Sequence, residues 1–151
     1  MRASLVLVAV MFLSACGQSV AGPSDQLSLS LEVTPNEIRA SEMRAGESVY
    51  LRMTVVNHGT SPHEIVMNVC PGPFTISTSD DEPVQPAPRI CSLSLQVRML
   101  EGGEEVELGL PWSGDVASGY LSPGEYRLRG RVPVVQGGVL LSAPQTIRIL
   151  P

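Results

Sequence analysis

The stretch that decides the fold is VYLRMTVVN, residues Val49–Asn57. Its apolar residues Val49, Leu51, Met53 and Val55 stand at every second position, so the stretch has a period of two. Side chains of a β-strand alternate between the two faces of a sheet, whereas those of a helix return to one face every 3.6 residues. The pattern therefore predicts a half-buried strand with these four side chains on a core.

The same period of two recurs on both sides of this strand. Apolar positions of the other predicted strands are Leu27, Leu29, Leu31 and Val33; Ile65, Met67 and Val69; Cys91, Leu93, Leu95, Val97 and Met99; Val106, Leu108 and Leu110; Tyr126, Leu128, Gly130 and Val132; and the segment Val139–Ile149. Turn residues such as Gly, Pro and Asn separate the runs. Short strands at this spacing predict an all-β fold, an antiparallel β-sandwich of about seven to nine strands.

Two segments depart from the alternation. Asn36–Arg44 has enough helix formers for one turn but lacks good caps, so we expect an edge strand or irregular structure there and almost no helix in the chain. Thr78–Ile90 contains Asp80, Asp81 and Glu82 followed by three prolines. Acids and prolines at this density are excluded from a central strand, so the segment is predicted to be a long loop.

The N-terminus is typical of an export signal. A basic start precedes the apolar run Ala3–Phe12, which ends in Leu13-Ser14-Ala15-Cys16. This ending is similar to the lipobox of bacterial lipoproteins, where the cysteine thiol is acylated and the preceding peptide bond is cut. The resemblance predicts a signal peptide over residues 1–15, a lipid on Cys16 and a lipidated tether over residues 16–26. The alternating strands then place the β-sandwich domain over residues 27–151.

The alternatives to a lipid anchor are a membrane-spanning helix and ordinary secretion. A membrane-spanning helix needs ~20 apolar residues, and the run here is shorter. Ordinary secretion would release the protein after cleavage. With acylation, the protein is expected on the bacterial cell envelope, held in the membrane by palmitate-type lipid. Gly17 offers no Asp-type retention signal, so the outer membrane is the expected destination in a host that has one.

The charge balance excludes one class of partner. The formal net charge is −5, with 10 basic and 15 acidic residues. Nucleic-acid binding requires a cationic surface to replace the counterions of the phosphates, so we expect no nucleic-acid partner. An acidic body is also held at an anionic membrane by lipid and not by charge.

Acylation of Cys16 would leave Cys70 and Cys91 as an even pair in an exported protein. Disulfides persist in such compartments, so one bridge between Cys70 and Cys91 is predicted. A metal site formed by these cysteines with His58 and His63 is the alternative. Ligand pairs at the short spacing of metal motifs are absent from the sequence, so we expect no metal and no cofactor.

Three segments together resemble a known family. They are Val55–Gly59, Leu100–Glu104 leading to Trp112, and Leu121–Tyr126. They resemble the intracellular proteinase inhibitor (BsuPI-type) domain, an immunoglobulin-like β-sandwich, over roughly Leu27–Ile149. The resemblance implies an immunoglobulin-like fold and protease inhibition. The chain departs from the family in the middle, where the proline-rich acidic loop and a cysteine pair replace an aromatic-rich strand.

No arrangement of residues in the sequence indicates catalysis. His58 and His63 fall at a turn and a strand start, and no serine stands in a G-x-S-x-G motif. We therefore expect no enzyme activity and no catalytic residue. Asp80–Glu82 is either a solvated loop tip or a calcium ligand set, since calcium prefers oxygen ligands.

The candidate partner-binding residues are Arg89, Trp112, Arg127, Arg129 and Arg131. Trp112 is either a core side chain or a ligand platform, and Tyr126 is expected to bond a backbone group at a sandwich turn. Arg127, Arg129 and Arg131 alternate along one strand, so they share one face. That face either pairs with nearby acids or docks an anionic partner.

The function predicted from these features is that of a lipid-anchored, non-enzymatic protein-interaction module with an unidentified protein partner. A first alternative is an inhibitor of exported proteases, in which the loop closed by Cys70 and Cys91 would present Arg89 to a trypsin-like pocket. A second is a structural subunit of an envelope assembly, in which a partner covers a sheet edge.

Overall fold

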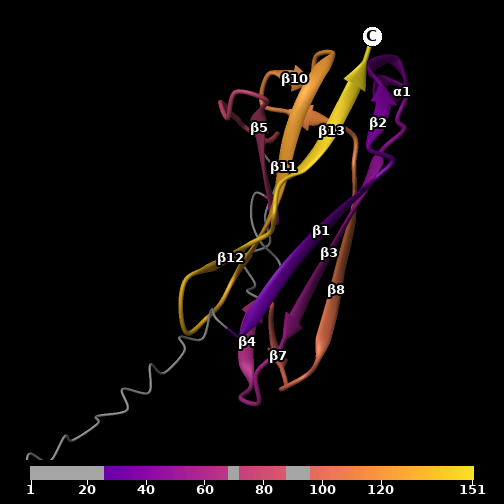
Figure 1. The fold of residues 1–151 in the computed structure, drawn as a ribbon. Helices are drawn as coiled ribbons and strands as arrows, with labels where there is room; N and C mark the ends of the chain where they lie inside the picture. Colours follow the sequence, from indigo (N-terminus) through magenta and orange to yellow (C-terminus); the bar gives the residue numbers. More distant parts are fainter. Residues whose placement is uncertain (1–25, 68–71, 88–95) are drawn as a thin grey trace, which may run out of the picture.

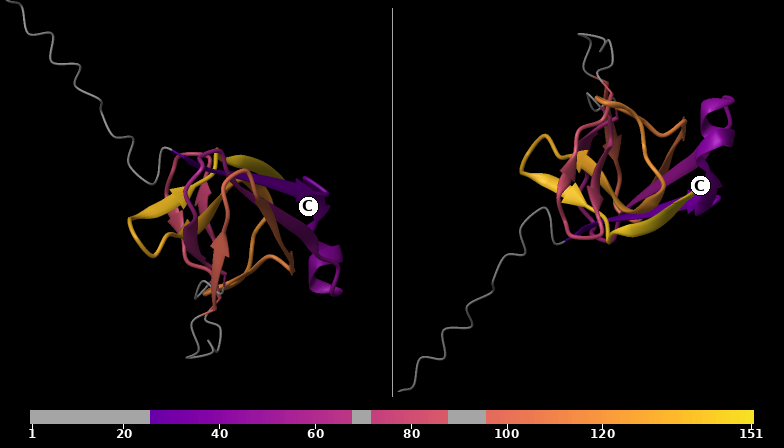
Figure 2. Two further views of the ribbon diagram at one scale, coloured as in Figure 1. Left: turned by 90° about the horizontal axis from the view of Figure 1, so that it is seen from below. Right: turned by 90° about the horizontal axis from the view of Figure 1, so that it is seen from above.

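The computed structural model describes residues 26–67, 72–87 and 96–151. In these ranges the chain forms two layers of β-strands around a shared core, with one short helix at the rim (Figure 1). The end-on views show the strands enclosing this interior (Figure 2). The predicted all-β class and antiparallel, immunoglobulin-like sandwich are confirmed.

The first sheet is three-stranded and antiparallel. It has the order β1-β3-β8, with β1 at Leu27–Thr34, β3 at Val49–Asn57 and β8 at Glu105–Trp112. The stretch that suggested the fold is therefore the central strand of this sheet, paired along its length on both sides.

The second layer is built around the long strand β11, Gly124–Pro133. Its sheet has the order β2-β13-β11-β5-β6, and β12 extends the pairing of β11 beyond β13. Bounds of these strands are β2 Glu37–Arg39, β5 Phe74–Thr78, β6 Pro83–Val84, β12 Val139–Leu141 and β13 Gln145–Leu150. The pair β4 (His63–Val66) and β7 (Val97–Leu100) joins the end of β11 through a bridge between Ile65 and Val134.

The distribution of strands between the layers follows the immunoglobulin scheme. One sheet holds the equivalents of strands A, B and E, namely β1, β3 and β8, while β4 and β5, β11, and β12 and β13 take the places of C, F and G. The described residues contain thirteen strand segments, more than the seven to nine expected. The excess arises because several segments, such as the hairpin of β9 (Asp115–Val116) and β10 (Gly119–Tyr120), are only two residues long.

The core lies between the two layers. Val49, Leu51, Met53 and Val55 of β3 are each 0% exposed, as their alternation predicted. The second layer contributes Leu128, Val132 and Ile147, which are likewise fully buried. Complete burial of one such side chain stabilises the fold by about 1.5–3 kcal/mol, so a strand with four of them anchors the sandwich.

The prediction for Asn36–Arg44 was partly wrong. Glu37–Arg39 is an edge strand, paired in parallel with β13, but Ala40–Arg44 forms the helix α1. The Glu42 carboxylate accepts a hydrogen bond from the backbone N–H of Arg39 at 2.9 Å and so caps the first turn. Met43, 1% exposed, fixes the helix on the core.

The segment Thr78–Ile90 is a loop for most of its described length, to Ala87. It also contains the two-residue edge strand β6, which pairs with β5. Pro83 is tolerated in β6 because an edge strand leaves one row of backbone groups unpaired.

No helix in the described part of the chain is long and apolar enough to span a membrane.

The prediction that Val97 and Met99 face the core was wrong. Leu100 is buried, whereas Val97 and Met99 are 43% and 47% exposed. The register explains the difference: Leu100 pairs with the inward-facing His63, and Met99 pairs with Glu64 on the outer face. The alternation was read correctly, but it was assigned to the wrong face.

Candidate binding surface

Arg127, Arg129 and Arg131 lie on the outer face of β11. Their inward neighbours Leu128 and Val132 are fully buried, so the alternation places the three guanidinium groups together on the other face, as predicted. They line an open hollow of about 590 Å³, which we call the arginine hollow. Its other lining residues are Thr75, Ser77, Asp81, Leu141 and Pro144.

Neighbouring strands supply the walls of the arginine hollow. In the register of β11 with β5, Arg127 is opposite Ser77 and Arg129 is opposite Thr75. On the other side of β11, Arg131 is opposite Leu141 of β12. Directly opposed residues share a face of the sheet, so two hydroxyl groups and one apolar side chain border the arginines.

One of the three arginines is neutralised within the chain. Arg127 Nη1 lies 2.7 Å from Asp81 Oδ1. Asp81 is positioned by the turn between β5 and β6, in which its backbone N–H donates to the carbonyl of Thr78. At the acidic loop tip Asp80–Glu82, the carboxylate of Asp81 thus binds a cation of the chain itself, the Arg127 guanidinium.

Arg129 and Arg131 are in a different position. Neither makes an ion pair with any residue in the described ranges, and Arg129 is exposed while Arg131 is half-buried. The expectation that nearby acids pair with this face therefore holds for Arg127 alone. A guanidinium group presents a planar set of N–H donors that matches a carboxylate or phosphate, so the arginine hollow is suited to an anion.

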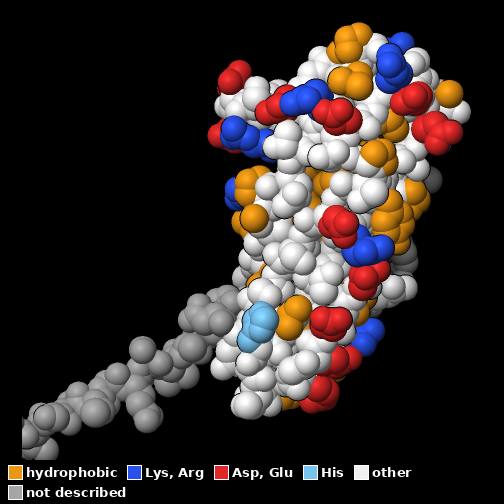
Figure 3. Space-filling model, turned by 45° about the vertical axis from the view of Figure 1, so that its right-hand side comes forward, with side chains coloured by type: hydrophobic (Ala, Val, Ile, Leu, Met, Phe, Trp, Pro, Cys, Tyr) orange, Lys and Arg blue, Asp and Glu red, His pale blue; other side chains and the backbone are white. Residues whose placement is uncertain are grey.

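The outer face of the first sheet provides a contrast. There Arg52 lies 3.5 Å from Glu32 and 3.5 Å from Glu107. Figure 3 shows such acidic and basic side chains alternating down this side of the molecule. Its charges are balanced locally, whereas those of Arg129 and Arg131 are not.

Trp112 is not available as a binding platform, which corrects its inclusion among the partner-binding candidates. It is 1% exposed and packs edge-to-face on Phe74, with ring centroids 5.4 Å apart. Its indole Nε1 donates to the carbonyl of Asp115 at 3.3 Å. The alternative that Trp112 is a core side chain is the correct one.

The two histidines bind different neighbours. His58 Nε2 is 2.7 Å from Ser28 Oγ at the surface. His63 is 6% exposed, and its Nε2 is 3.3 Å from Gln26 Oε1. Within the described residues, no carboxylate contacts either ring, and no group of three His, Cys, Asp or Glu side chains is placed to hold a metal ion.

Four residues with predicted roles lie outside the described residues. They are Cys16, Cys70, Arg89 and Cys91. The lipidation, the disulfide and the protease-directed arginine therefore remain predictions from the sequence.

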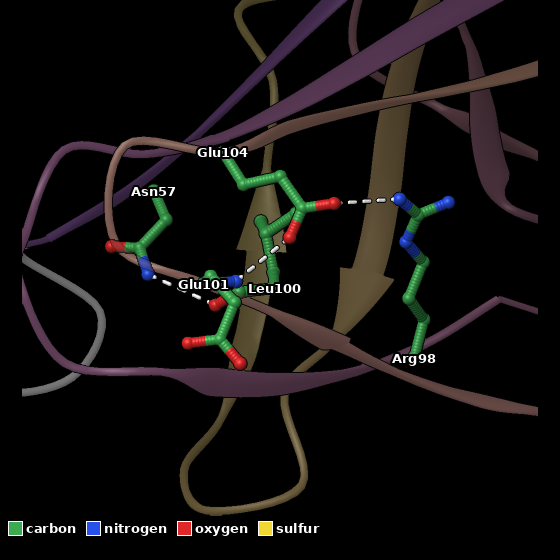
Figure 4. Close-up of polar contacts among 5 residues, drawn as sticks. All are labelled: Asn57, Arg98, Leu100, Glu101 and Glu104. Carbon is green, nitrogen blue, oxygen red and sulfur yellow. Dashed lines mark hydrogen bonds and ion pairs between the residues drawn. The ribbon is translucent and has the colours of Figure 1, made fainter.

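Asn57 connects the first two segments that carry the family resemblance, Val55–Gly59 and Leu100–Glu104. The sequence alone could not show this connection. Its Nδ2 donates to the carbonyls of Ser61 at 2.8 Å and Leu100 at 3.1 Å, and its Oδ1 accepts from the N–H of Gly59 at 2.9 Å. Its backbone N–H donates to the carbonyl of Glu104. Figure 4 shows this fully buried amide beside the turn that follows Leu100.

The third segment forms the turn that was expected of it. Tyr126, near the start of β11, donates its hydroxyl proton to the carbonyl of Ser122 at 3.0 Å. This is the geometry of the tyrosine corner of immunoglobulin-like sandwiches. The side chain is half-buried.

The side chain of Glu104 also stabilises the turn that follows Leu100, which Asn57 contacts (Figure 4). Its Oε2 accepts from the N–H of Glu101 at 2.9 Å, and its Oε1 accepts from Arg98 Nη2 at 2.7 Å. The backbone hydrogen bond, followed by the bond to Arg98, lowers the pKa of this carboxyl below its ordinary value of 4.5. The ionised form is thus favoured by folding.

The lowered pKa predicts a contribution to stability that depends on pH. The contribution is complete above the unfolded-state pKa, near 4.5, and is lost as the pH falls through the lower folded-state pKa. We expect Glu104→Gln to lose less thermal stability than the wild type as the pH is lowered from about 6 to below 4.5, because only the wild type loses this carboxylate by protonation. Glu105→Gln, at the exposed neighbouring position, is the control and should follow the wild type; a Glu104→Gln curve parallel to both would contradict the prediction.

The fold and the hollow together define an all-β sandwich with an arginine-lined hollow on one face. The chain matches no protein-family model and no curated protein. Among solved structures it is similar to the Pseudomonas fluorescens alkylpurine DNA glycosylase AlkC, with a TM-score of 0.51 and 17% identity. The match covers 83% of this chain and 31% of the glycosylase, so this chain spans about a third of that protein.

Other similar structures are more distant. The cupredoxin domain of amoB from Nitrosocaldus yellowstonii has a TM-score of 0.47 and 11% identity, covering 85% of this chain and 90% of that one. A β-glucosidase from Listeria innocua has a TM-score of 0.44 and 15% identity, covering 83% and 16%. At 17% identity the similarity to the glycosylase concerns the fold and not the activity.

Proposed function

We propose that this protein is a lipid-anchored module of the bacterial cell envelope that binds a partner protein without catalysis. The observation that carries the proposal is the arginine hollow, in which Arg129 and Arg131 have no acidic partner among the described residues. Aspartate or glutamate side chains of a partner protein would supply the negative charge that Arg129 and Arg131 lack. Arginine is also enriched among the residues that dominate protein interfaces.

Further observations support a binding role for the sandwich domain as a whole. Asn57 joins the first two segments that resemble the BsuPI-type family, and Tyr126 closes the third segment as a separate turn of the same sandwich. Sandwich domains of this kind bind through sheet faces and end loops, which a rigid core holds in place. A binding role needs no nucleophile or base, and within the ranges that the structure describes His58 and His63 contact Ser28 and Gln26 and no carboxylate.

The proposal predicts selective loss of anion binding. The probe is a fluorescein-labelled peptide of eight glutamates, titrated against the full lipidated chain in detergent. We expect the double variant Arg129→Gln/Arg131→Gln to weaken binding at least about tenfold, because charge-assisted hydrogen bonds contribute about 1.5–3 kcal/mol each. Anisotropy gives the Kd.

The matched control is Arg52→Gln, which removes one positive charge that Glu32 and Glu107 already balance. It should change the Kd by less than about twofold, since paired surface charges contribute little. Equal weakening by the control and the double variant would show a net-charge effect and reject the arginine hollow as the site. An unaltered Kd in the double variant would reject it as well.

A further inference from the structure

An apolar band crosses the outer face of the second layer at one end of the molecule. Its members are Val97, Met99, Val135 and Val139, which are 43% to 50% exposed. They belong to strands β7 and β12 and to the end of the β11–β12 hairpin. This is a large share of the exposed large hydrophobic side chains in the described part of the chain, where the others are Tyr50, Tyr120 and Leu141.

The strand register shows that the band is continuous. Val139 is opposite Pro133 on β11, so both face outward. Ile65 of β4 is bridged to Val134 on the inner face, which puts the next residue, Val135, on the outer face. Glu64 and Val66 share that face, where they pair with Met99 and Val97. The band thus runs across β12, β11, β4 and β7.

The start of the described chain lies at the same end of the molecule as this band. The backbone carbonyl of Gln26 accepts a hydrogen bond from the N–H of His58 at 2.7 Å. The side chain of Gln26 contacts His63 of β4. The adjacent residue Glu64 accepts a hydrogen bond at its carbonyl from the N–H of Val135, at 2.9 Å. In Figure 1 the β11–β12 hairpin, β4 and β7 lie toward the end where β1 begins, and β10 and α1 lie at the other.

The distance from Gln26 to the predicted lipid is short. Roughly ten residues separate Gln26 from Cys16, and ten residues of any chain span at most ~35 Å. A tether of this length holds the band at an effective concentration on the order of millimolar with respect to the membrane. A weak surface contact would therefore be populated.

We propose that the apolar band docks this domain onto the phospholipid surface that carries its own lipid anchor. The inference rests on the lipid anchor of the proposed function. Aliphatic side chains would enter the interfacial layer, and Arg131, which borders the band on β11, would lie near lipid phosphates. Docking would hold the arginine hollow in a fixed orientation relative to the membrane.

A tryptophan introduced into the band provides the test. The chain contains one natural tryptophan, and Trp112 is buried, so it gives a constant background. Lipidated Val135→Trp protein is reconstituted in vesicles of phosphatidylethanolamine and phosphatidylglycerol, with or without bromine on the acyl chains. We expect brominated lipid to quench about half of the added emission, because docked apolar faces lie roughly 5–10 Å into the headgroup and acyl boundary.

Two further variants make the outcome specific. Tyr120→Trp places the reporter in the hairpin of β9 and β10 at the other end, where exposure is similar, and should not be quenched. Adding Met99→Gln and Val139→Thr to Val135→Trp should abolish most of the quenching, because these changes remove apolar neighbours. Quenching that survives them would mean that the tryptophan inserts by itself, and it would overturn the proposal.

The remaining outcomes separate this inference from the proposed function. Protein that carries the lipid by mass and floats with the vesicles, yet shows no quenching at position 135, would overturn membrane docking and leave the band to a protein partner. Protein without lipid would contradict the anchor itself. Equal quenching at positions 120 and 135 would overturn a preferred orientation.

Discussion

Asn57→Ala is expected to lower the free energy of unfolding by about 2–4 kcal/mol, since each buried polar group left without a partner costs about 1–3 kcal/mol. The side chain is 0% exposed and serves three backbone groups, on Gly59, Ser61 and Leu100. Alanine leaves all three without these bonds and opens a small cavity. Urea unfolding, followed by the fluorescence of the buried Trp112, gives the free energy.

Two comparisons define the cause of this loss. Asn57→Asp keeps the acceptor for Gly59 but sets a carboxylate oxygen against the carbonyls of Ser61 and Leu100, so it should destabilise at least as strongly as alanine. Asn36→Ala, at an exposed position, should stay within about 0.5 kcal/mol of the wild type. A loss at Asn57 no larger than that at Asn36 would disprove the role assigned to the amide.

The strands that the sequence predicted best are those in which the period of two is long and one face is wholly apolar. Leu51 and Met53 of β3 illustrate this, because alternation is a property of consecutive residues and needs no knowledge of the partner strand. The helix α1 shows the limit of such local patterns. Five residues are too few for a helical period, and α1 depends on Glu42 and on Met43 packing against the core.

The face that a strand turns to the core is set by its partners. Val97 and Met99 satisfy the alternation of a core strand, but the pairing of Leu100 with His63 turns them outward. A one-residue change of register exchanges the two faces of a strand, and a single sequence does not fix the register of distant strands. The apolar band could therefore not be predicted, although each of its residues was visible.

The arginine hollow was half predictable for a related reason. The shared face of Arg127, Arg129 and Arg131 follows from their spacing on one strand. Which of them is neutralised depends on Asp81, which is 46 positions from Arg127 and is brought close by the turn between β5 and β6. The unpaired charge of the site is thus a product of the fold.

Cys16→Ala is expected to abolish lipid attachment completely and to leave the precursor uncleaved. The reason is chemical: the thioether to the lipid needs a thiol at this position, and the alanine methyl group cannot form one. Metabolic labelling with radioactive palmitate should give no labelled band for the variant, and the protein should migrate at the mass of the uncleaved chain. Fractionation should no longer recover mature, lipid-bearing protein with the envelope membranes.

The other two cysteines of the chain provide matched controls. Cys70→Ala and Cys91→Ala each remove one thiol from the body of the protein, so they should keep full palmitate labelling and normal cleavage. Loss of label in all three variants would indicate a folding or export defect and would not support acylation of Cys16. Labelled Cys16→Ala protein would refute the assignment, and with it the tethered geometry on which membrane docking of the apolar band depends.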